Sequence, residues 1–422
     1  MVSVELLQKT EIERRYIPRE RRLSPALGPL SIPPSGFMHN FIASAIETRA
    51  RPFVGVRRLA DPNPPRHFPL QPTGVSTTPM VDAAQAFLAS LSLEQRYGCL
   101  CGIESDVYRS WCNFHSFLFR RGACLQLLSE PQRDLALALL RESMGEYGFE
   151  TARNVMRLNE YLGEFTGRPE EFGQWYYWLS IMGVPSPTEP WGFQLDGHHL
   201  NINCFVLGDQ VVLTPTFMGS EPVSADDGPY AGTRLFAQEE ARALRLIESL
   251  TPEQVAQTVV GTELPFDVFG HAFNDDYVVP DEGLSAAAMS SAQRELLADV
   301  IRIYVSRERA GQAELRLAEV LAHLDDTRFT WIGGWEGESP FYYRVDNPAI
   351  VIEFVHQPGV MFANDLPSRR QAHTLVRTPN GNDYGKSLLR QYYERVRASG
   401  GSREQAFQRP SDNPMDDLRR GG

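Results

Sequence analysis

The sequence predicts an α+β fold, in which antiparallel hairpins form a sheet flanked by helices and a proline-rich N-terminal arm is extended. Two runs of strand-forming residues fold back at short polar turns near residues 208–209 and 346–347. Helical segments lie before and between these hairpins, which favours α+β over a doubly wound parallel sheet. With 42% hydrophobic and 22% charged residues among 422, the chain is able to bury a core.

Proline content predicts the N-terminal arm. Residues 1–79 hold 12 of the 30 prolines, and proline fixes φ and removes a backbone donor. We expect this arm to be extended, with a helix only near 38–49, and to join copies of the chain in a homo-oligomer. Residues 80–397 are expected to form one large catalytic domain. The polar, glycine-rich stretch 398–422 is expected to be a disordered tail.

Four helices are predicted to start in the same way. In each, Ser or Thr is followed three residues later by Gln, the reciprocal capping-box pattern. We interpret this as repeated use of one helix start, since an internal repeat would need similarity beyond the cap. The four pairs are Ser92 and Gln95, Ser129 and Gln132, Thr251 and Gln254, and Ser290 and Gln293.

Strand patterns appear in two predicted hairpins. The first pairs Leu200–Val206 with Gln210–Thr214 across a Gly-Asp turn. The second pairs Phe341–Val345 with Ala349–Phe354 across an Asp-Asn turn, and Phe329–Ile332 is a candidate neighbouring strand. These strands are the predicted sheet.

Composition also excludes classes of function. The net charge of −12 argues against a nucleic-acid partner, because such partners favour a basic face. No run of 18 apolar residues predicts a membrane span. Five cysteines, an odd and small number, indicate reduced thiols, so we expect a cytoplasmic protein. The phosphate-binding, dinucleotide-binding, serine-esterase and zincin motifs are missing from the sequence.

The most informative segment runs from Trp191 to Asn203. If residues 199–205 form a strand, a histidine and two asparagines share one face, and such a polar row is typical of a site. Adjacent histidines on a regular strand point to opposite faces, so both reach one metal only if Gly197 breaks the pleat. The candidates are His198 and His199 as metal ligands, Asp196 as their hydrogen-bond partner, and Gln194, Asn201 and Asn203 as substrate contacts. The alternative is that one or both histidines are structural.

A second informative segment lies near the C-terminus. Glu353 interrupts an apolar strand, and a carboxylate there is costly unless it is exposed, paired or metal-bound. His373 and Arg377 follow it. Two imidazoles and a carboxylate suffice for a non-haem iron site or for a catalytic zinc with an open position. Exposure on a half-buried strand is the alternative for Glu353.

These segments together resemble the DUF3500 family, a domain of unknown function. The resemblance rests on Trp191–Leu200 and Leu213–Pro222, with Tyr108–Asn113 upstream and Ala372–Arg377 and Asn382–Gly385 downstream, and it covers roughly residues 80–395. Family members usually have Trp where this chain has Phe193. They also carry His-x-His where this chain reads Gln371-Ala-His373, so only the second histidine is available. The resemblance implies a shared site and supplies no reaction.

The leading hypothesis is a metal-dependent enzyme that hydrolyses a small anionic substrate. His198 or His199, Glu353 and His373 would hold a divalent metal ion, most suitably zinc, that activates water. Asp196 or Glu221 would act as general base, Arg377 would neutralise the substrate, and Trp335 would lie on a glycine-rich loop over it. The alternatives are an oxidative enzyme with iron or copper on the same ligands, and a non-catalytic binding protein.

Overall fold

A large mixed β-sheet organises the protein, which a computed structural model describes over residues 36–61, 68–113, 121–362 and 364–400. The expected arm before residue 36 and most of the expected tail lie outside these residues. Within the arm, helix α2 (Gly36–Ala50) forms where the sequence predicts a helix near 38–49. Helices and the sheet confirm the predicted α+β class.

The order of strands along the sheet is β11, β12, β13, β14, β15, β8, β6, β5, β4 and β2, while β3, β7 and β9 pair beside this path. Neighbours are antiparallel except for the parallel pairs β2–β4 and β9–β12. The bounds are β2 (Leu100–Cys101), β3 (Ala123–Cys124), β4 (Tyr177–Gly183), β5 (Trp191–Gly197), β6 (Leu200–Leu207), β7 (Gln210–Val212), β8 (Thr216–Ser220), β9 (Val259–Gly261), β11 (Leu284–Ser285), β12 (Arg328–Gly333), β13 (Phe341–Asp346), β14 (Val351–Gln357) and β15 (Ser368–Arg377). Outside this sheet, β1 (Arg57–Arg58) pairs with β10 (Val278–Val279).

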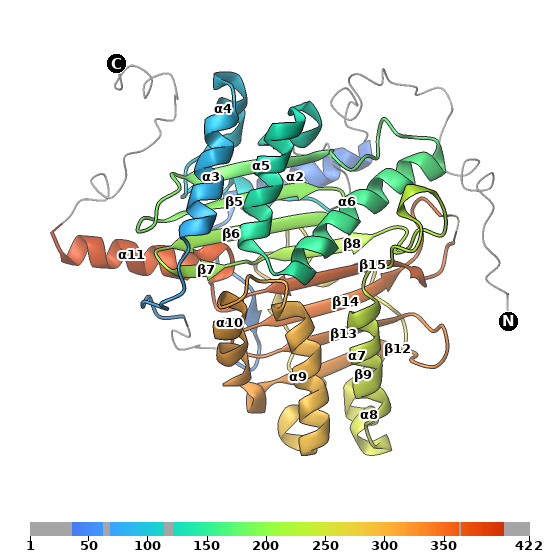
Figure 1. Ribbon diagram of the computed structural model, residues 1–422. Helices are drawn as coiled ribbons and strands as arrows, with labels where there is room; N and C mark the ends of the chain where they lie inside the picture. Colours follow the sequence, from blue (N-terminus) through green and yellow to red (C-terminus); the bar gives the residue numbers. More distant parts are fainter. Residues whose placement is uncertain (1–35, 62–67, 114–120, 363, 401–422) are drawn as a thin grey trace.

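Helices cover one face of the sheet, as Figure 1 shows for α3, α5, α6, α7, α9 and α10. Their apolar sides and the strand residues that face them form the larger buried cluster. The opposite face packs a smaller cluster against Trp111, Tyr384 and Leu388. The helices are α3 (Thr78–Ser90), α4 (Leu93–Cys99), α5 (Glu130–Ser143), α6 (Glu146–Thr166), α7 (Ala237–Glu248), α8 (Pro252–Thr258), α9 (Ser291–Val305), α10 (Gln312–Leu321) and α11 (Lys386–Ala398).

Both predicted hairpins and the neighbouring strand are confirmed. Strand β6 turns into β7 with Leu207 opposite Gln210, and β13 pairs with both β12 and β14. The structure adds β4 and β5, which the sequence analysis did not identify as strands. Each residue of both strands is buried. In β4 a polar–apolar alternation is therefore weak, whereas β5 alternates Trp191, Phe193 and Leu195 with Gly192, Gln194 and Asp196.

All four predicted helix starts form, and their glutamines reveal a repeat. In each cap, Gln Oε1 accepts a hydrogen bond from the backbone N–H of the capping residue at 2.8–3.0 Å. Gln132 also donates to Gln95 Oε1 at 3.0 Å, just as Gln293 donates to Gln254 Oε1 at 2.8 Å. The similarity therefore extends beyond the caps, and the narrower interpretation as one reused helix start was wrong.

The repeat comprises two halves of the fold. The order α3, α4, β2, β3, α5, α6, β4, β5, β6, β8 recurs as α7, α8, β9, β11, α9, α10, β12, β13, β14, β15. In the sheet, the strand order outward from β8 matches the order outward from β15. The antiparallel pair β8–β15 therefore lies at an approximate two-fold axis that relates the halves.

Two glycines occupy equivalent tight positions in the halves, and alanine at either is expected to destabilise the fold. A Cβ at Gly122 (φ +106°) would lie 2.5 Å from Leu179 O, and one at Gly283 (φ +89°) would lie 2.6 Å from Phe329 O. Positive φ and overlap together cost about 2–4 kcal/mol of unfolding free energy. Gly208→Ala is the control, because Gly208 has φ +61° and open space around it. Urea denaturation that gives equal losses for all three variants would contradict the packing argument.

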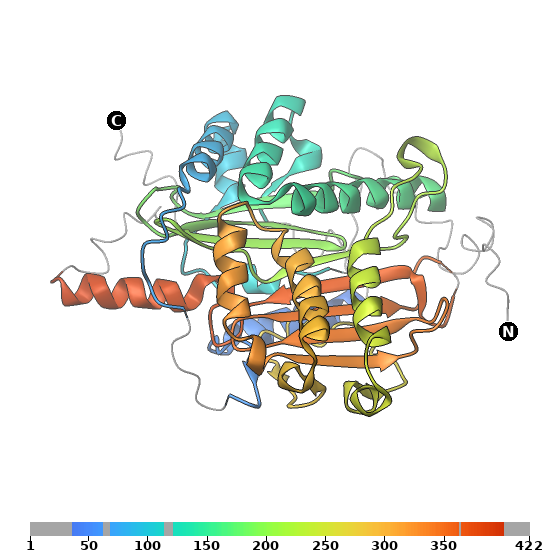
Figure 2. The same ribbon diagram turned by 60° about the horizontal axis from the view of Figure 1, so that its bottom comes forward.

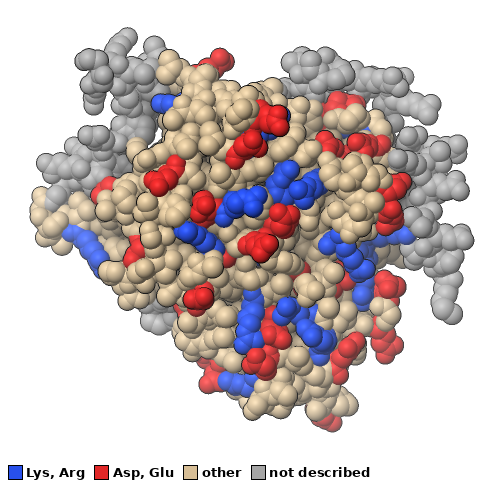
Figure 3. Space-filling view, in the orientation of Figure 1, with Lys and Arg blue, Asp and Glu red and all other residues tan. Residues whose placement is uncertain are grey.

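The exterior carries charges of both signs. On the face shown in Figure 3, lysines and arginines are interspersed with acidic residues instead of forming one basic surface. Helix α11 extends away from the body of the fold in both ribbon views (Figures 1 and 2). Among the described helices, none is long and apolar enough to cross a membrane.

Candidate active site

The two adjacent histidines form the turn between β5 and β6. The strands pair up to Gly197 and Leu200, so His198 and His199 are the two turn residues instead of strand residues. His199 adopts φ 59°, an uncommon conformation for a residue other than glycine. Its backbone is held on both sides, because its N–H donates to Asn113 O at 2.9 Å and its carbonyl accepts from Gly219 N at 2.7 Å. The expectation that residue 199 begins a strand was therefore wrong.

The turn places both imidazoles in one row with a third. The rings of His198 and His199 stack at 4.0 Å between centroids, and His199 lies 5.0 Å from the ring of His373. Phe172 and Phe217 close the two ends of this row, at 5.3 Å from His198 and 4.9 Å from His373. On a regular strand the side chains of His198 and His199 would point to opposite faces of the sheet. In the turn they lie side by side.

Room for the third imidazole comes from a glycine on the neighbouring strand. His373 on β15 lies directly opposite Gly219 on β8. A Cβ at Gly219 would lie 2.5 Å from Cδ2 of the His373 ring. Since β8 belongs to the first half of the repeat and β15 to the second, the histidine row joins the two halves.

Oxygen atoms fix the orientation of two of these rings. Asn159 Oδ1 on α6 lies 2.8 Å from His198 Nδ1, and Asp267 Oδ1 lies 2.8 Å from His373 Nδ1. An acceptor at Nδ1 favours the tautomer with the proton there and leaves a lone pair on Nε2. Burial, with a smaller effect of the neighbouring imidazoles, lowers the pKa of His198 to about 3 and that of His199 well below its usual value. These imidazoles are therefore neutral electron-pair donors.

Two buried polar atoms beside Asp267 have no partner in the described part of the chain. They are His373 Nε2 and Asn113 Oδ1. Asp267 links the two residues, because its Oδ1 contacts His373 and its Oδ2 accepts from Asn113 Nδ2 at 3.4 Å. Buried polar atoms are normally hydrogen-bonded, and a bound ion, a water molecule or a catalytic role are among the explanations for an exception. Two electron-pair donors in this position suit a metal ion or a proton donor such as water.

The predicted polar row forms a continuous chain of hydrogen bonds beside the histidines. Gln194 donates to Asn203 Oδ1 at 2.7 Å, Asn203 to Asn201 Oδ1 at 2.6 Å, and Asn201 to Asp196 Oδ1 at 3.1 Å. All four side chains are buried and lie on one face of β5 and β6. Asp196 also accepts from Cys112 N at 3.4 Å. The sequence suggests that Asp196 orients a histidine ring, but the hydrogen bonds of Asp196 go to Asn201 and Cys112. Asn159 and Asp267 orient the imidazoles instead.

Asp196 is expected to make stability depend on pH. Burial raises the pKa of its carboxyl to about 7, above about 3.9 in the unfolded chain. Between these values the folded state keeps a proton that the unfolded state releases, so stability falls as pH rises from about 4 to 7. In Asp196→Asn, unfolding free energy should fall less steeply as pH rises, by up to about 1.4 kcal/mol per pH unit. Urea titrations at pH 4.5 to 7.5 measure it, and an unchanged slope would contradict the assignment.

Glu353 and Arg377 are engaged in holding one loop. The oxygens of Glu353 accept from Phe269 N, Gly270 N and Tyr342 Oη, each at 2.8 Å. Arg377 donates to Gly270 O at 2.8 Å and pairs with Asp383 at 2.9 Å. The costly buried carboxylate is therefore satisfied by hydrogen bonds from protein donors. These contacts anchor the segment that carries Asp267, so both residues act on His373 through that loop.

Glu221 and Trp335 also have structural partners. One oxygen of Glu221 accepts from the backbone N–H groups of residues 360, 361 and 362 at 2.8–2.9 Å, and burial raises the pKa of this carboxyl to about 7. Met361 and Phe362 of that loop pack against Phe172 in one buried cluster, and Phe172 ends the histidine row. Trp335, on the loop between β12 and β13, packs against the larger core.

The histidine row meets part of what a metal site requires. It supplies imidazoles, a His373 Nε2 without a partner among the described residues, and partners that orient two of the rings. However, within the described ranges no three His, Cys, Asp or Glu side chains are already grouped as a metal site. His198 stacks on His199 instead of converging with it on one point. His199, His373 and the amide oxygen of Asn113 are the donors that fit a metal best.

Sequence reasoning missed the three residues that complete this site. Asn113 lies within the segment that carries the family resemblance, which was a usable signal. Asn159 lies on the buried side of α6, and Asp267 lies in a loop without a motif. No spacing in the sequence links either one to the histidines, because only the tertiary fold brings them together.

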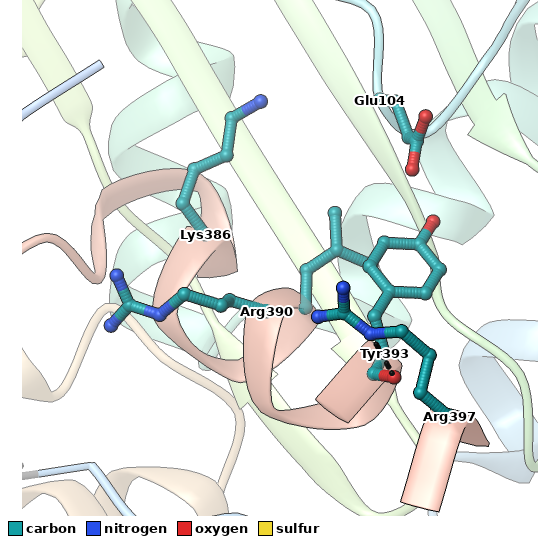
Figure 4. A pocket seen from close by; sticks show the side chains of 6 residues that line it. Glu104, Lys386, Arg390, Tyr393 and Arg397 are labelled. Carbon is teal, nitrogen blue, oxygen red and sulfur yellow. Dashed lines mark hydrogen bonds between the residues drawn. The ribbon is translucent and has the colours of Figure 1, made fainter. Parts of the chain in front are cut away.

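Two cavities lie away from the predicted site residues. One, of about 330 Å³, lies on α11 and is lined by Glu104, Lys386, Leu389, Arg390, Tyr393 and Arg397 (Figure 4). Lys386 there pairs with Asp106 at 3.0 Å. The other, of about 340 Å³, lies between β7 and α10. Since neither is lined by a histidine of the row, the candidate active site rests on its chemistry and not on cavity size.

A family model agrees with the resemblance carried by these residues. No curated protein and no solved structure matches the chain. The model described as "Protein of unknown function (DUF3500)" matches residues 73–386, which include the histidine turn, Asp267, Glu353 and His373. Because this match spans well over half of the 422 residues, the chain belongs to the DUF3500 family.

Proposed function

We propose that the protein is a hydrolase whose active centre is the row of His198, His199 and His373, with a divalent metal ion held by His199 and His373. One observation carries the proposal: His373 is oriented by Asp267 through Nδ1, while its buried Nε2 has no partner in the described residues. Small organic esters and amides are the proposed substrates. Because Arg377 is engaged with Asp383 and the 270–271 backbone, the proposal assigns no charge to the substrate.

The roles of the residues follow from their contacts. A bound divalent ion would lower the pKa of a water ligand and polarise a carbonyl group. Asp267 holds the His373 ring in the tautomer that presents Nε2, and Asn159 does the same for His198. The Asn113 amide oxygen accepts a hydrogen bond from the attacking water or adds a third donor atom. The aromatic rings at both ends of the row limit access of bulk water.

A metal-free hydrolase is the second candidate, and a specific observation favours it. The described residues contain no ready group of three metal ligands, whereas the Asp267–His373 pair is already complete as an acid–base dyad. In this version His373 Nε2 accepts a proton from water, and the Asp267 carboxylate stabilises the resulting imidazolium. Both candidates place the reaction at His373.

Elemental analysis of purified full-length protein tests the metal. Wild type, His199→Ala, His373→Ala and the control His323→Ala, which changes a partly exposed histidine, are compared after metal is supplied. We expect about one metal ion per chain in wild type and control, and loss of the ion in the other two variants. Screening with small esters and amides, with and without chelator, completes the test.

The outcomes separate the alternatives. Zinc with chelator-sensitive hydrolysis supports the proposal. Hydrolysis that persists without bound metal would favour the acid–base dyad. Iron or copper with oxygen consumption would replace hydrolysis by oxidative chemistry. A folded protein that binds no metal and hydrolyses nothing in the screen would point instead to a non-catalytic binding protein.

A further inference from the structure

The second half of the repeat contains a counterpart of the candidate active site. The turn between β13 and β14 takes the place of the histidine turn, and α10 takes the place of α6. Arg316 on α10 donates to Ala349 O in that turn at 2.7 Å, as Asn159 on α6 contacts His198 in the other. This counterpart lies at the opposite end of the β8–β15 pair, where Thr214 and Thr378 bond at 2.7 Å.

The turn of this counterpart has no histidine, and a cavity lies beside its helix α10. Pro348 and Ala349 stand in the turn where the first half has His198 and His199. The cavity of about 340 Å³ is bounded by β7, α10 and the segment that begins at Phe68. Hydrogen bonds tie that segment across the cavity, from Gln71 N to Gln210 Oε1 at 2.8 Å and from Gln312 Nε2 to Val75 O at 3.4 Å.

Charges in this cavity do not balance. Its lining includes Glu308, Glu319 and Arg316 as the charged residues. Arg316 is already engaged through Nη1 with Glu319 at 2.5 Å and through Nη2 with Ala349 O and Thr378 Oγ1. Only its Nε approaches Glu308, at 4.0 Å. No hydrogen bond in the described part of the chain ends on the Glu308 carboxylate, which therefore faces the cavity with a surplus negative charge.

Apolar side chains line the same cavity as this carboxylate. Phe68, Leu213, Leu315 and Leu388 line the same cavity, and the Arg316 guanidinium lies 5.9 Å from the centroid of the Phe68 ring. A cavity lined by a carboxylate, an aromatic ring and aliphatic side chains matches an organic cation, because an ammonium group pairs with the carboxylate while its carbon chain covers apolar surface. Burial, opposed by the nearby Arg316, raises the pKa of the Glu308 carboxyl to about 7.

We propose that this cavity is a second binding site, distinct from the histidine row, for a small organic molecule that carries a protonated amine. The ammonium group donates hydrogen bonds to Glu308, and its carbon chain lies against Phe68 and Leu213. The site does not depend on the hydrolase proposal. It assigns a ligand class to the counterpart site, whose turn between β13 and β14 lacks histidines.

Calorimetric titration of the full chain with n-butylamine at pH 8 tests this site. n-Butanol is the uncharged analogue, and sodium chloride controls for ionic strength. We expect saturable binding of the amine, at least tenfold weaker binding of the alcohol, and at least a tenfold loss of amine affinity in Glu308→Gln. Glu142→Gln, which changes a carboxylate with 41% of its side chain exposed, should bind as wild type does.

A second variant guards against an indirect effect of Glu308→Gln. Leu315 is 39% exposed at the rim, so Leu315→Trp fills the cavity without disturbing the core. It should abolish amine binding while the thermal unfolding temperature stays close to wild type. Equal binding of amine and alcohol, no binding beyond the salt control, or retained affinity in Glu308→Gln would each overturn the proposal.

Discussion

Replacing Asp267 with asparagine is expected to lower kcat/KM for hydrolysis by about 10–10⁴-fold while the protein stays folded. Both oxygens of Asp267 are acceptors: Oδ1 contacts His373 Nδ1 and Val268 N, and Oδ2 contacts Asn113 Nδ2. In either orientation, the new amide nitrogen therefore faces a donor. If it faces His373, the ring takes the other tautomer and loses the lone pair on Nε2.

The size of this loss distinguishes the two hydrolase candidates. A residue that orients a metal ligand typically contributes about 10–100-fold, whereas the carboxylate behind a general-base histidine contributes about 10⁴-fold. The pH profile of kcat/KM is a second measurement. If His373 is the general base, removing the neighbouring carboxylate shifts the apparent pKa of the profile, whereas a purely structural change would not. Asp276→Asn, at an exposed ion pair with Arg51, is the control. Activity within threefold of wild type in Asp267→Asn would refute a role for the pair.

The second large effect is expected at Arg377, in stability instead of catalysis. Arg377→Met removes the pair with Asp383 at 2.9 Å and the hydrogen bonds to the carbonyls of residues 270 and 271. Asp383 is fully buried, so its carboxylate is left without its cation. We expect a loss of about 3–5 kcal/mol in unfolding free energy, measured by urea denaturation.

A double variant separates the stranded charge from the lost contacts. In Arg377→Met with Asp383→Asn, the buried charge is gone, while Asn Oδ1 can still accept from Thr378 N, as Asp383 does at 2.7 Å. Part of the lost stability should return, since replacing both members of a buried pair is much less costly than removing one. A single variant that loses under about 1 kcal/mol would show that this ion pair does not hold the loop.

Local signals made much of the fold predictable. The four Ser/Thr–Gln caps and the turn at 208–209 depend on neighbours in sequence, and each forms as expected. The second turn was predicted at 346–347 but lies at 348–349, because Asp346 and Asn347 still pair with Val351 and Ile350.

Strand β4 escaped because it is buried on both faces and shows no period of two. Strand β5 does alternate, with Gln194 and Asp196 on one face and Phe193 and Leu195 on the other, and this usable signal was missed. In the sequence the repeat showed only as shared helix caps. Its main evidence is the order of strands in the sheet, which the sequence does not reveal.

The candidate site was predictable in its histidines but not in their partners. His198, His199 and His373 were identified by residue type and family resemblance, and the structure brings their rings together. The side chains of His198 and His199 lie together because the two residues form a turn, whereas the sequence pattern predicts that His199 begins a strand. A buried carboxylate such as Glu353 needs a partner, but whether that partner is a metal or a backbone N–H depends on a loop 83 residues away.

The pairing of β8 with β15 has a consequence for how this protein could be divided. A break in the connection between β8 and α7 would give two fragments, each with one of these strands as an open sheet edge. Open edges pair readily, so the fragments should reassemble with each other or aggregate alone. His198 and His199 lie in one fragment, and His373 lies in the other with Asp267. The complete histidine row would therefore report fragment complementation, because it exists only when the two edges have joined.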